Sequence, residues 1–199
     1  MAQQNLYYQT ELQDSVSLLP NQMDSNIDEY LLKNLEAKVK GKITKDGIVL
    51  KINRIIDYDN GIITKTNFAG TAVYNVSYEC LICSPTKNLS VICVVENIIK
   101  GYIICVNGPV IIAILFNNID TQKFKLDNGN VVYLHNEKPI EKGDYVKVSI
   151  INIKNNLNEK RITAISKLLD LASNDEIKLF KEDQIIAVNG EINTNKEFI

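Results

Sequence analysis

Four cysteines and a single histidine are the residues of this chain with the most versatile chemistry. Cys80 and Cys83 form one CxxC pair, Cys93 and Cys105 follow, and the histidine is His135. A structural zinc site needs a second such pair or nearby histidines. The CxxC pair also lies in a strand-like run, where residues three apart point to opposite faces. We therefore predict buried thiols in a reducing compartment, with no metal site and no cofactor.

Motifs that would indicate an enzyme are missing from the sequence. There is no glycine-rich phosphate loop ending in GK[ST], no GxSxG and no HExxH. A cysteine nucleophile paired with His135 remains an alternative, because the sequence does not place the two together. Slow labelling of all four thiols in the folded protein would remove that alternative. We predict a binding protein with no catalytic residues.

Charge and hydropathy narrow the class of protein further. The net charge is −2, so no overall basic field indicates nucleic acid. Residues 86–170 are the only net positive segment, with 11 basic and 8 acidic side chains. The amino terminus lacks the features of a secretory signal, and the longest apolar stretch, residues 110–116, is too short to span a bilayer. We expect a soluble, intracellular protein without a membrane partner.

The elements of the first half can be read from apolar spacing and turn residues. Residues 6–20 form an extended segment that ends at Pro20, and a helix follows with Ile27, Leu31 and Leu35 in one stripe. Alternating strands then surround the turn at residues 57–61, where Asn-Gly accepts positive φ. The longest strand begins near residue 72 and ends at Cys83. This order predicts an α+β domain with a helix on an antiparallel sheet.

The second half reads as a different domain. Five or six β-like segments lie between residues 89 and 166 at the spacing of a small barrel. A hairpin is expected at Asp127–Asn130, and a closing helix at residues 166–180. The joint is placed at residues 84–88. The predicted domains are therefore 1–85 and 86–180, followed by a flexible tail at 181–199.

The ordered series of these segments resembles the stalk subunits of multisubunit DNA-directed RNA polymerases. That family includes subunit seven of RNA polymerase II and its archaeal equivalent, with counterparts in large DNA viruses. The stretches that carry the resemblance are residues 6–12, 18–20, 32–41, 46–52, 70–85, 94–103 and 107–109. At the joint, where the family has arginine-phenylalanine-lysine, this chain has Ser84-Pro85-Thr86-Lys87. The many Asn, Ile and Lys residues favour a large DNA virus as the source.

The resemblance implies a fold, a function and partners. The fold would be a truncated ferredoxin-like domain followed by an OB barrel. The function would be that of a non-catalytic polymerase subunit that docks on the large subunits, pairs with a subunit-four-like partner and contacts nascent single-stranded RNA weakly. Its location would be the nucleus for a cellular protein, or the host cytoplasm and virion for a viral one. The core-docking positions would be Asp46, Gly47, Asp57, Asp59, Asn60, Gly61, Asn67 and Gly70.

An RNA face of the barrel would combine stacking aromatic rings with basic side chains. The expected RNA-binding residues are Lys100, Tyr102, Phe116, Lys123, Lys125, Tyr133, His135 and Arg161. The alternative function is a free-standing OB-fold RNA-binding protein of translation or RNA decay. Such a protein would not need the extended segment at residues 6–12 or the Leu-Leu-Pro element at residues 18–20.

Overall fold

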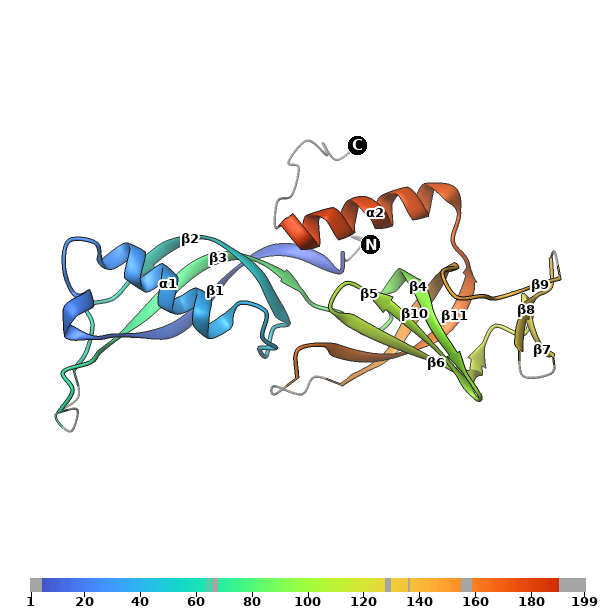
Figure 1. Ribbon diagram of the computed structural model, residues 1–199, viewed down its shortest axis with the longest axis horizontal. Coiled ribbons are helices and arrows are strands. Elements are labelled where there is room, and N and C mark those ends of the chain that lie inside the picture. Colours follow the sequence, from blue (N-terminus) through green and yellow to red (C-terminus); the bar gives the residue numbers. More distant parts are fainter. Residues whose placement is uncertain are drawn as a thin grey trace. The chain divides into compact units, whose positions relative to one another are not determined.

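The computed structural model describes residues 5–63, 65, 68–127, 130–135, 137–154 and 159–189. The chain divides into two compact units (Figure 1). One unit comprises residues 7–83, and the other comprises residues 84–199 together with 1–6.

The first unit is a three-stranded antiparallel sheet with a helix on one face. Its elements are β1 (Tyr7–Leu18), a 3-10 turn (Pro20–Gln22), α1 (Ile27–Val39), β2 (Ile48–Tyr58) and β3 (Ala72–Cys83). The strand order is β1-β3-β2. β1 pairs with β3 over its whole length without a shift, whereas the pairing of β2 with β3 shifts register three times. The helix on an antiparallel sheet is confirmed, and the ferredoxin-like relation remains a prediction.

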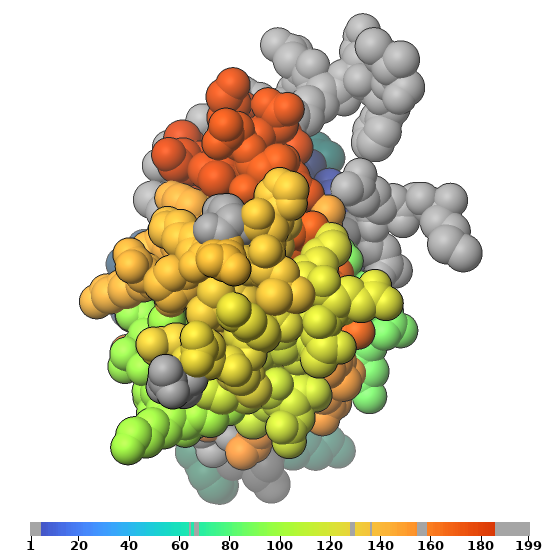
Figure 2. Space-filling model, turned by 90° about the vertical axis from the view of Figure 1, so that its right-hand side faces the viewer, coloured from blue at the N-terminus to red at the C-terminus, as the bar shows by residue number. Residues whose placement is uncertain are grey.

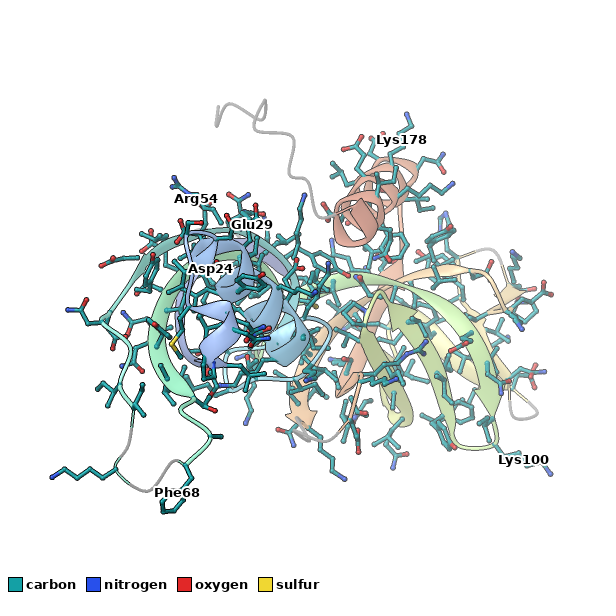
Figure 3. All side chains as sticks on the ribbon, turned by 60° about the vertical axis from the view of Figure 1, so that its left-hand side comes forward. Asp24, Glu29, Arg54, Phe68, Lys100 and Lys178 are labelled. Atoms are coloured by element: carbon teal, nitrogen blue, oxygen red, sulfur yellow. The ribbon has the colours of Figure 1, made fainter. Side chains whose placement is uncertain are left out.

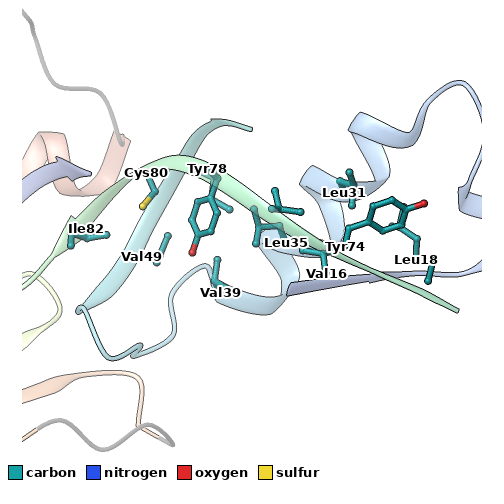
Figure 4. Packing of buried hydrophobic residues seen from close by; sticks show 13 residues of the cluster. Val16, Leu18, Leu31, Leu35, Val39, Val49, Tyr74, Tyr78, Cys80 and Ile82 are labelled. Carbon is teal, nitrogen blue, oxygen red and sulfur yellow. The ribbon is translucent and has the colours of Figure 1, made fainter. Parts of the chain in front are cut away.

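Apolar residues at alternate strand positions and on one stripe of α1 make the core of this unit. Leu31 and Leu35 of α1 are fully buried against the inward side chains of all three strands. Figure 4 shows this buried cluster, including the rings of Tyr74 and Tyr78. The opposite face of the sheet carries mostly polar side chains, as expected where one face of an antiparallel sheet meets water.

The second unit is a closed barrel of five strands in the order β10-β11-β6-β5-β4. The strands are β4 (Ser90–Ile99), β5 (Tyr102–Asn107), β6 (Val110–Ile119), β10 (Tyr145–Lys154) and β11 (Ile162–Leu171). β6 and β11 run parallel, and the other neighbours are antiparallel. Along each strand, buried residues alternate with more exposed ones, so every second side chain points into the barrel. The barrel prediction is confirmed, and the topology is consistent with an OB fold.

A small antiparallel sheet is inserted between β6 and β10. It contains β7 (Phe124–Asp127), β8 (Asn130–Tyr133) and β9 (Lys138–Pro139), and Asp127 pairs with Asn130 as the hairpin prediction required. We call β7, β8 and β9 the inserted sheet.

The closing helix, α2, begins later and runs further than the sequence suggested. Residues 162–171 form β11, and α2 spans Asn174–Asn189. The predicted helix at residues 166–180 was wrong for residues 166–171, because alternate side chains of this part, including Ser166 and Leu168, point into the barrel. Residues 174–180 are helical, as predicted. Within the segment 181–199, for which a flexible tail was predicted, residues 181–189 belong to α2. The remainder of the segment lies outside the described residues.

Candidate docking tip and nucleic-acid interface

One end of the first unit is built from three chain segments, residues 18–20, 58–63 and 68–74, which we call the tip. Leu18 pairs with Ala72, and Ile62 forms a bridge with Val73. The carboxylate of Asp59 accepts hydrogen bonds from both the backbone and the side-chain nitrogen of Asn75, at 2.9 and 2.7 Å. Backbone pairing and this carboxylate therefore fix the loop between β2 and β3 onto the sheet.

The tip exposes four large apolar side chains. Leu19 is 50% exposed, Ile62 61%, Ile63 54% and Phe68 fully exposed. Figure 3 shows Phe68 on the loop that ends the first unit. Singly exposed apolar residues are ordinary on a protein surface, but these four lie in the connections at one end of the same sheet. These four residues are therefore the candidate docking surface of the first unit.

The predicted core-docking residues do not all lie at the tip. Asp57, Asp59, Asn60, Gly61 and Gly70 belong to it or adjoin it, and Asn67 lies outside the described residues. Asp46 and Gly47 are instead in the turn before β2, whose first residue pairs with the last residue of β3. That turn is at the opposite end of the sheet.

Several of the predicted tip residues have structural roles. Asp59 holds the loop, and Gly61 lies against the ring of Tyr74. Gly70 has a positive φ of 66° and adjoins Pro20. Sequence reasoning found these turn residues and missed the apolar ones. The available signal was the run Ile62-Ile63 directly after a turn, where polar residues are the rule.

The barrel unit gathers most of the predicted RNA-binding residues at one end. Lys100 occupies the β4–β5 turn, Tyr102 begins β5, and the Phe116 amide donates to the Gly101 carbonyl at 3.0 Å. The inserted sheet follows β6 directly. Figure 2 shows this turn (light green) and the inserted sheet (yellow) on one face. We call this face the barrel end. Arg161 adjoins Ile162, which pairs with the first residue of β6, so it lies at the other end of the barrel.

Asp170 of β11 connects the inserted sheet to the barrel. The Lys123 ammonium forms an ion pair with its carboxylate, and the Tyr133 hydroxyl also bonds to it. The bond to Asp170 raises the pKa of Lys123, and the same carboxylate raises the pKa of Tyr133. The ring of Tyr133 packs on buried Phe124 at 5.1 Å between centroids. Lys123 and Tyr133 thus hold the inserted sheet in place.

Other side chains of the barrel end are available to a ligand. Lys100 and Lys125 are exposed and have no acidic partner among the described residues. His135 is exposed, with its ring edge-on to Tyr133 at 6.3 Å. Tyr102 and Phe116 are half-buried beside the β4–β5 turn. Cations next to partly exposed rings are the elements of a single-strand-binding surface.

Comparison with known proteins places the chain in a family. Residues 13–67 match the profile described as "SHS2 domain found in N terminus of Rpb7p/Rpc25p/MJ0397". A protein of Acanthamoeba polyphaga mimivirus named "Putative DNA-directed RNA polymerase subunit L376" is 68% identical over 199 residues, which cover the whole of both chains. The chain belongs to this RNA polymerase subunit family. The resemblance read from the sequence is confirmed, including its link to large DNA viruses.

The four cysteines lie in the interiors of the two units. All four are buried free thiols. Burial raises the pKa of Cys80 to about 11 and that of Cys83 to about 12. Thiols with such pKa values are protonated at neutral pH and are poor nucleophiles. Within the described residues, no three His, Cys, Asp or Glu side chains come together as metal ligands, and no helix is long and apolar enough to cross a membrane.

Proposed function

We propose that this protein is a non-catalytic subunit of a viral DNA-directed RNA polymerase and forms its stalk. The observation that carries the proposal is the exposed apolar tip on an amino-terminal domain that matches the polymerase-subunit profile. Leu19, Ile62, Ile63 and Phe68 would be buried against the large polymerase subunits. Burying one large apolar side chain contributes about 1.5–3 kcal/mol, so this set can supply a substantial part of a docking interface.

The barrel end is the proposed contact with nascent single-stranded RNA. Lys100 and Lys125 would meet phosphates, while Tyr102, Phe116 and His135 would offer surfaces for stacking. A few cations give modest intrinsic affinity. Attachment to the polymerase compensates, because a tethered site meets the transcript at high effective concentration. A subunit-four-like partner would complete the stalk, and its place of action would be the host cytoplasm and the virion.

Affinity purification from the native source tests the docking role. The tagged chain should bring the two largest polymerase subunits with it. Replacing Ile62 and Phe68 together by serine should reduce the recovery of the large subunits at least tenfold. Serine would bury far less apolar surface at the interface than the two large side chains that it replaces. Leu179→Ser is the matched control, since Leu179 is a 49% exposed apolar residue of α2. Normal recovery with the tip variant, or equal loss with the control, would reject tip docking.

The free-standing RNA-binding alternative makes the opposite prediction. A translation or decay factor would be recovered without the large polymerase subunits, whether or not the tip is intact. The match of residues 13–67 to the polymerase-subunit domain favours the stalk.

A further inference from the structure

β1 is an edge strand, and only half of its free edge is sealed. In an antiparallel strand, alternate residues direct both backbone polar groups towards the same side. The Ser15 carbonyl accepts from Lys38 Nζ at 2.6 Å, and the Ser17 carbonyl accepts from Asn34 Nδ2 at 3.0 Å. The Ser15 amide donates to the Asp14 carboxylate at 2.7 Å. Side chains of α1 and β1 thus occupy the edge near the tip.

The other half of this edge is open. By the same alternation, the backbone N–H and C=O groups of Gln9, Glu11 and Gln13 point away from β3. These groups have no hydrogen-bond partner in the described part of the chain, and the three side chains are exposed. β1 is also regular here, because its register with β3 never shifts. A regular strand with unpaired backbone groups is a template for another strand.

The opposite edge of the sheet is protected in a different way. β2 shifts register against β3 at three places, and such bulges twist a strand and interrupt pairing. The two edges therefore differ, and only the first half of β1 is suited to accept another strand.

Charge on the polar face adds a second, independent signal at the same place. Arg54, Glu79 and Glu11 lie opposite one another on β2, β3 and β1. Arg54 Nε bonds to Glu79 Oε2 at 2.8 Å, but Glu11 has no cationic partner among the described residues. Glu11 and Glu79 form a pair without backbone hydrogen bonds, the kind that brings side chains closest. Like charges directly opposite each other on neighbouring strands are unfavourable. A cation on the other side of Glu11 would offset the repulsion between the Glu11 and Glu79 carboxylates.

We propose that the Gln9–Gln13 edge of β1 accepts an extended strand from another polypeptide, with a lysine or arginine opposite Glu11. Backbone hydrogen bonds would supply affinity, and the basic residue would fix the register. On the α1 face, 38% exposed Tyr8 and half-buried Leu12 would contact apolar residues of the added strand. A second copy of β1 is a poor occupant, because a pair centred on Glu11 would oppose two glutamates.

Residue-resolved amide hydrogen exchange tests this proposal. The tagged full-length chain is purified in its native assembly, whatever the composition, and compared with the isolated chain. The amides of Gln9, Glu11 and Gln13 should exchange at least tenfold more slowly in the assembly. The Thr10 and Leu12 amides, which face β3, should be protected in both samples and serve as internal references.

Two variants connect the protection to the edge. Glu11→Pro removes one outward N–H without removing a β1–β3 hydrogen bond, and should abolish the added protection at Gln9 and Gln13. Glu11→Lys should reduce it by reversing the charge, which keeps the test valid if the proline variant is unstable. Ser17→Pro is the matched control in the sealed half and should leave the protection unchanged.

The outcomes separate this proposal from polymerase docking. Absence of added protection at these amides, or protection that survives both Glu11 variants, would overturn the strand-addition proposal. The presence of large polymerase subunits in the assembly reports independently on the docking role of the tip.

Discussion

The ring of Tyr74 packs directly against Gly61, which leaves no room for a side chain at that position. A Cβ added to Gly61 would lie 2.6 Å from the Cε1 carbon of the ring. The sequence singled out Gly61 because an Asn-Gly turn accepts positive φ. Gly61 is not among the described glycines with positive φ. The need for glycine at this position therefore comes from the close approach of the Tyr74 ring. Spacing predicts a turn, but it does not show which distant ring packs on it.

Replacing this glycine should therefore destabilise the first unit. Gly61→Ala is expected to lower the free energy of unfolding by about 1–3 kcal/mol, the usual cost of overpacking. Urea denaturation of the full chain measures the change. Asn60→Ala, at the exposed neighbouring position, should cost no more than about 0.5 kcal/mol. Equal stability of Gly61→Ala and the wild type would show that the Tyr74 ring moves aside freely.

Among the elements, α2 is the one whose boundaries sequence reasoning misplaced. A capping box begins it: the Glu176 amide donates to Ser173 Oγ at 3.3 Å, and the Ser173 amide donates to Glu176 Oε2 at 2.9 Å. Ser173 and Glu176 have the spacing of this motif, so the helix start was readable. Glu176 also accepts a hydrogen bond from Lys147 of β10 at 2.7 Å, and Phe180 packs edge-on against Tyr145. Those contacts depend on the barrel and could not be read from spacing.

The anchor at Glu176 should make the docking of α2 depend on pH. The Lys147 ammonium, and then the Ser173 amide, hold the pKa of Glu176 below its ordinary value of 4.5. A carboxyl with a lowered folded-state pKa contributes stability above its unfolded pKa and loses it as pH falls through the folded value. Because the pair is partly exposed, Glu176→Gln should cost only about 0.5–1 kcal/mol at about pH 7.

Chemical denaturation at two pH values measures this contribution. The difference in unfolding free energy between wild type and Glu176→Gln should be largest near neutral pH and should shrink well below pH 4.5. Asp175→Asn, an exposed substitution in the same first turn, serves as the control for loss of charge. A difference that stays constant with pH would contradict an ionic anchor.

The inserted sheet shows why predicted RNA-binding residues are not equivalent. Lys123 is paired with Asp170, whereas Lys125 is exposed without an acidic partner among the described residues. Each phosphate contact with single-stranded RNA contributes about 0.7 to the slope of log affinity against log salt. Lys125→Gln should therefore lower this slope by about 0.7, and Lys100→Gln should do the same. Lys123→Gln should leave the slope nearly unchanged.

Fluorescence anisotropy of labelled single-stranded RNA across a salt series measures these slopes for the full chain. Lys178→Gln, an exposed change on α2, is the control for net charge. If Lys123→Gln lowers the slope as much as Lys125→Gln, the ion pair with Asp170 does not remove Lys123 from RNA contact. If no substitution at the barrel end changes the slope, RNA does not bind there.

For the whole molecule, the sequence predicted both kinds of domain and the barrel hairpin because these depend on local periodicity and turn residues. The predicted tip residues were only partly brought together. Asp46-Gly47 and Asp57–Gly61 are similar turn signals, but they lie at the two ends of β2. Within the described part of the chain, only the tip end exposes a group of large apolar residues. Sequence order alone cannot distinguish the two ends of a strand as binding surfaces.

Docking of the tip on the polymerase can be tested by site-specific photo-crosslinking. A photoreactive phenylalanine analogue is incorporated at position 68 of the otherwise wild-type chain in its native source. The crosslinked partner is then identified by mass spectrometry, with the same analogue at position 179 as a control. If the tip docks there, position 68 should crosslink to one of the two largest polymerase subunits, and position 179 should not. Efficient incorporation without such a crosslink, or equal crosslinking from both positions, would show that the tip does not dock on these subunits.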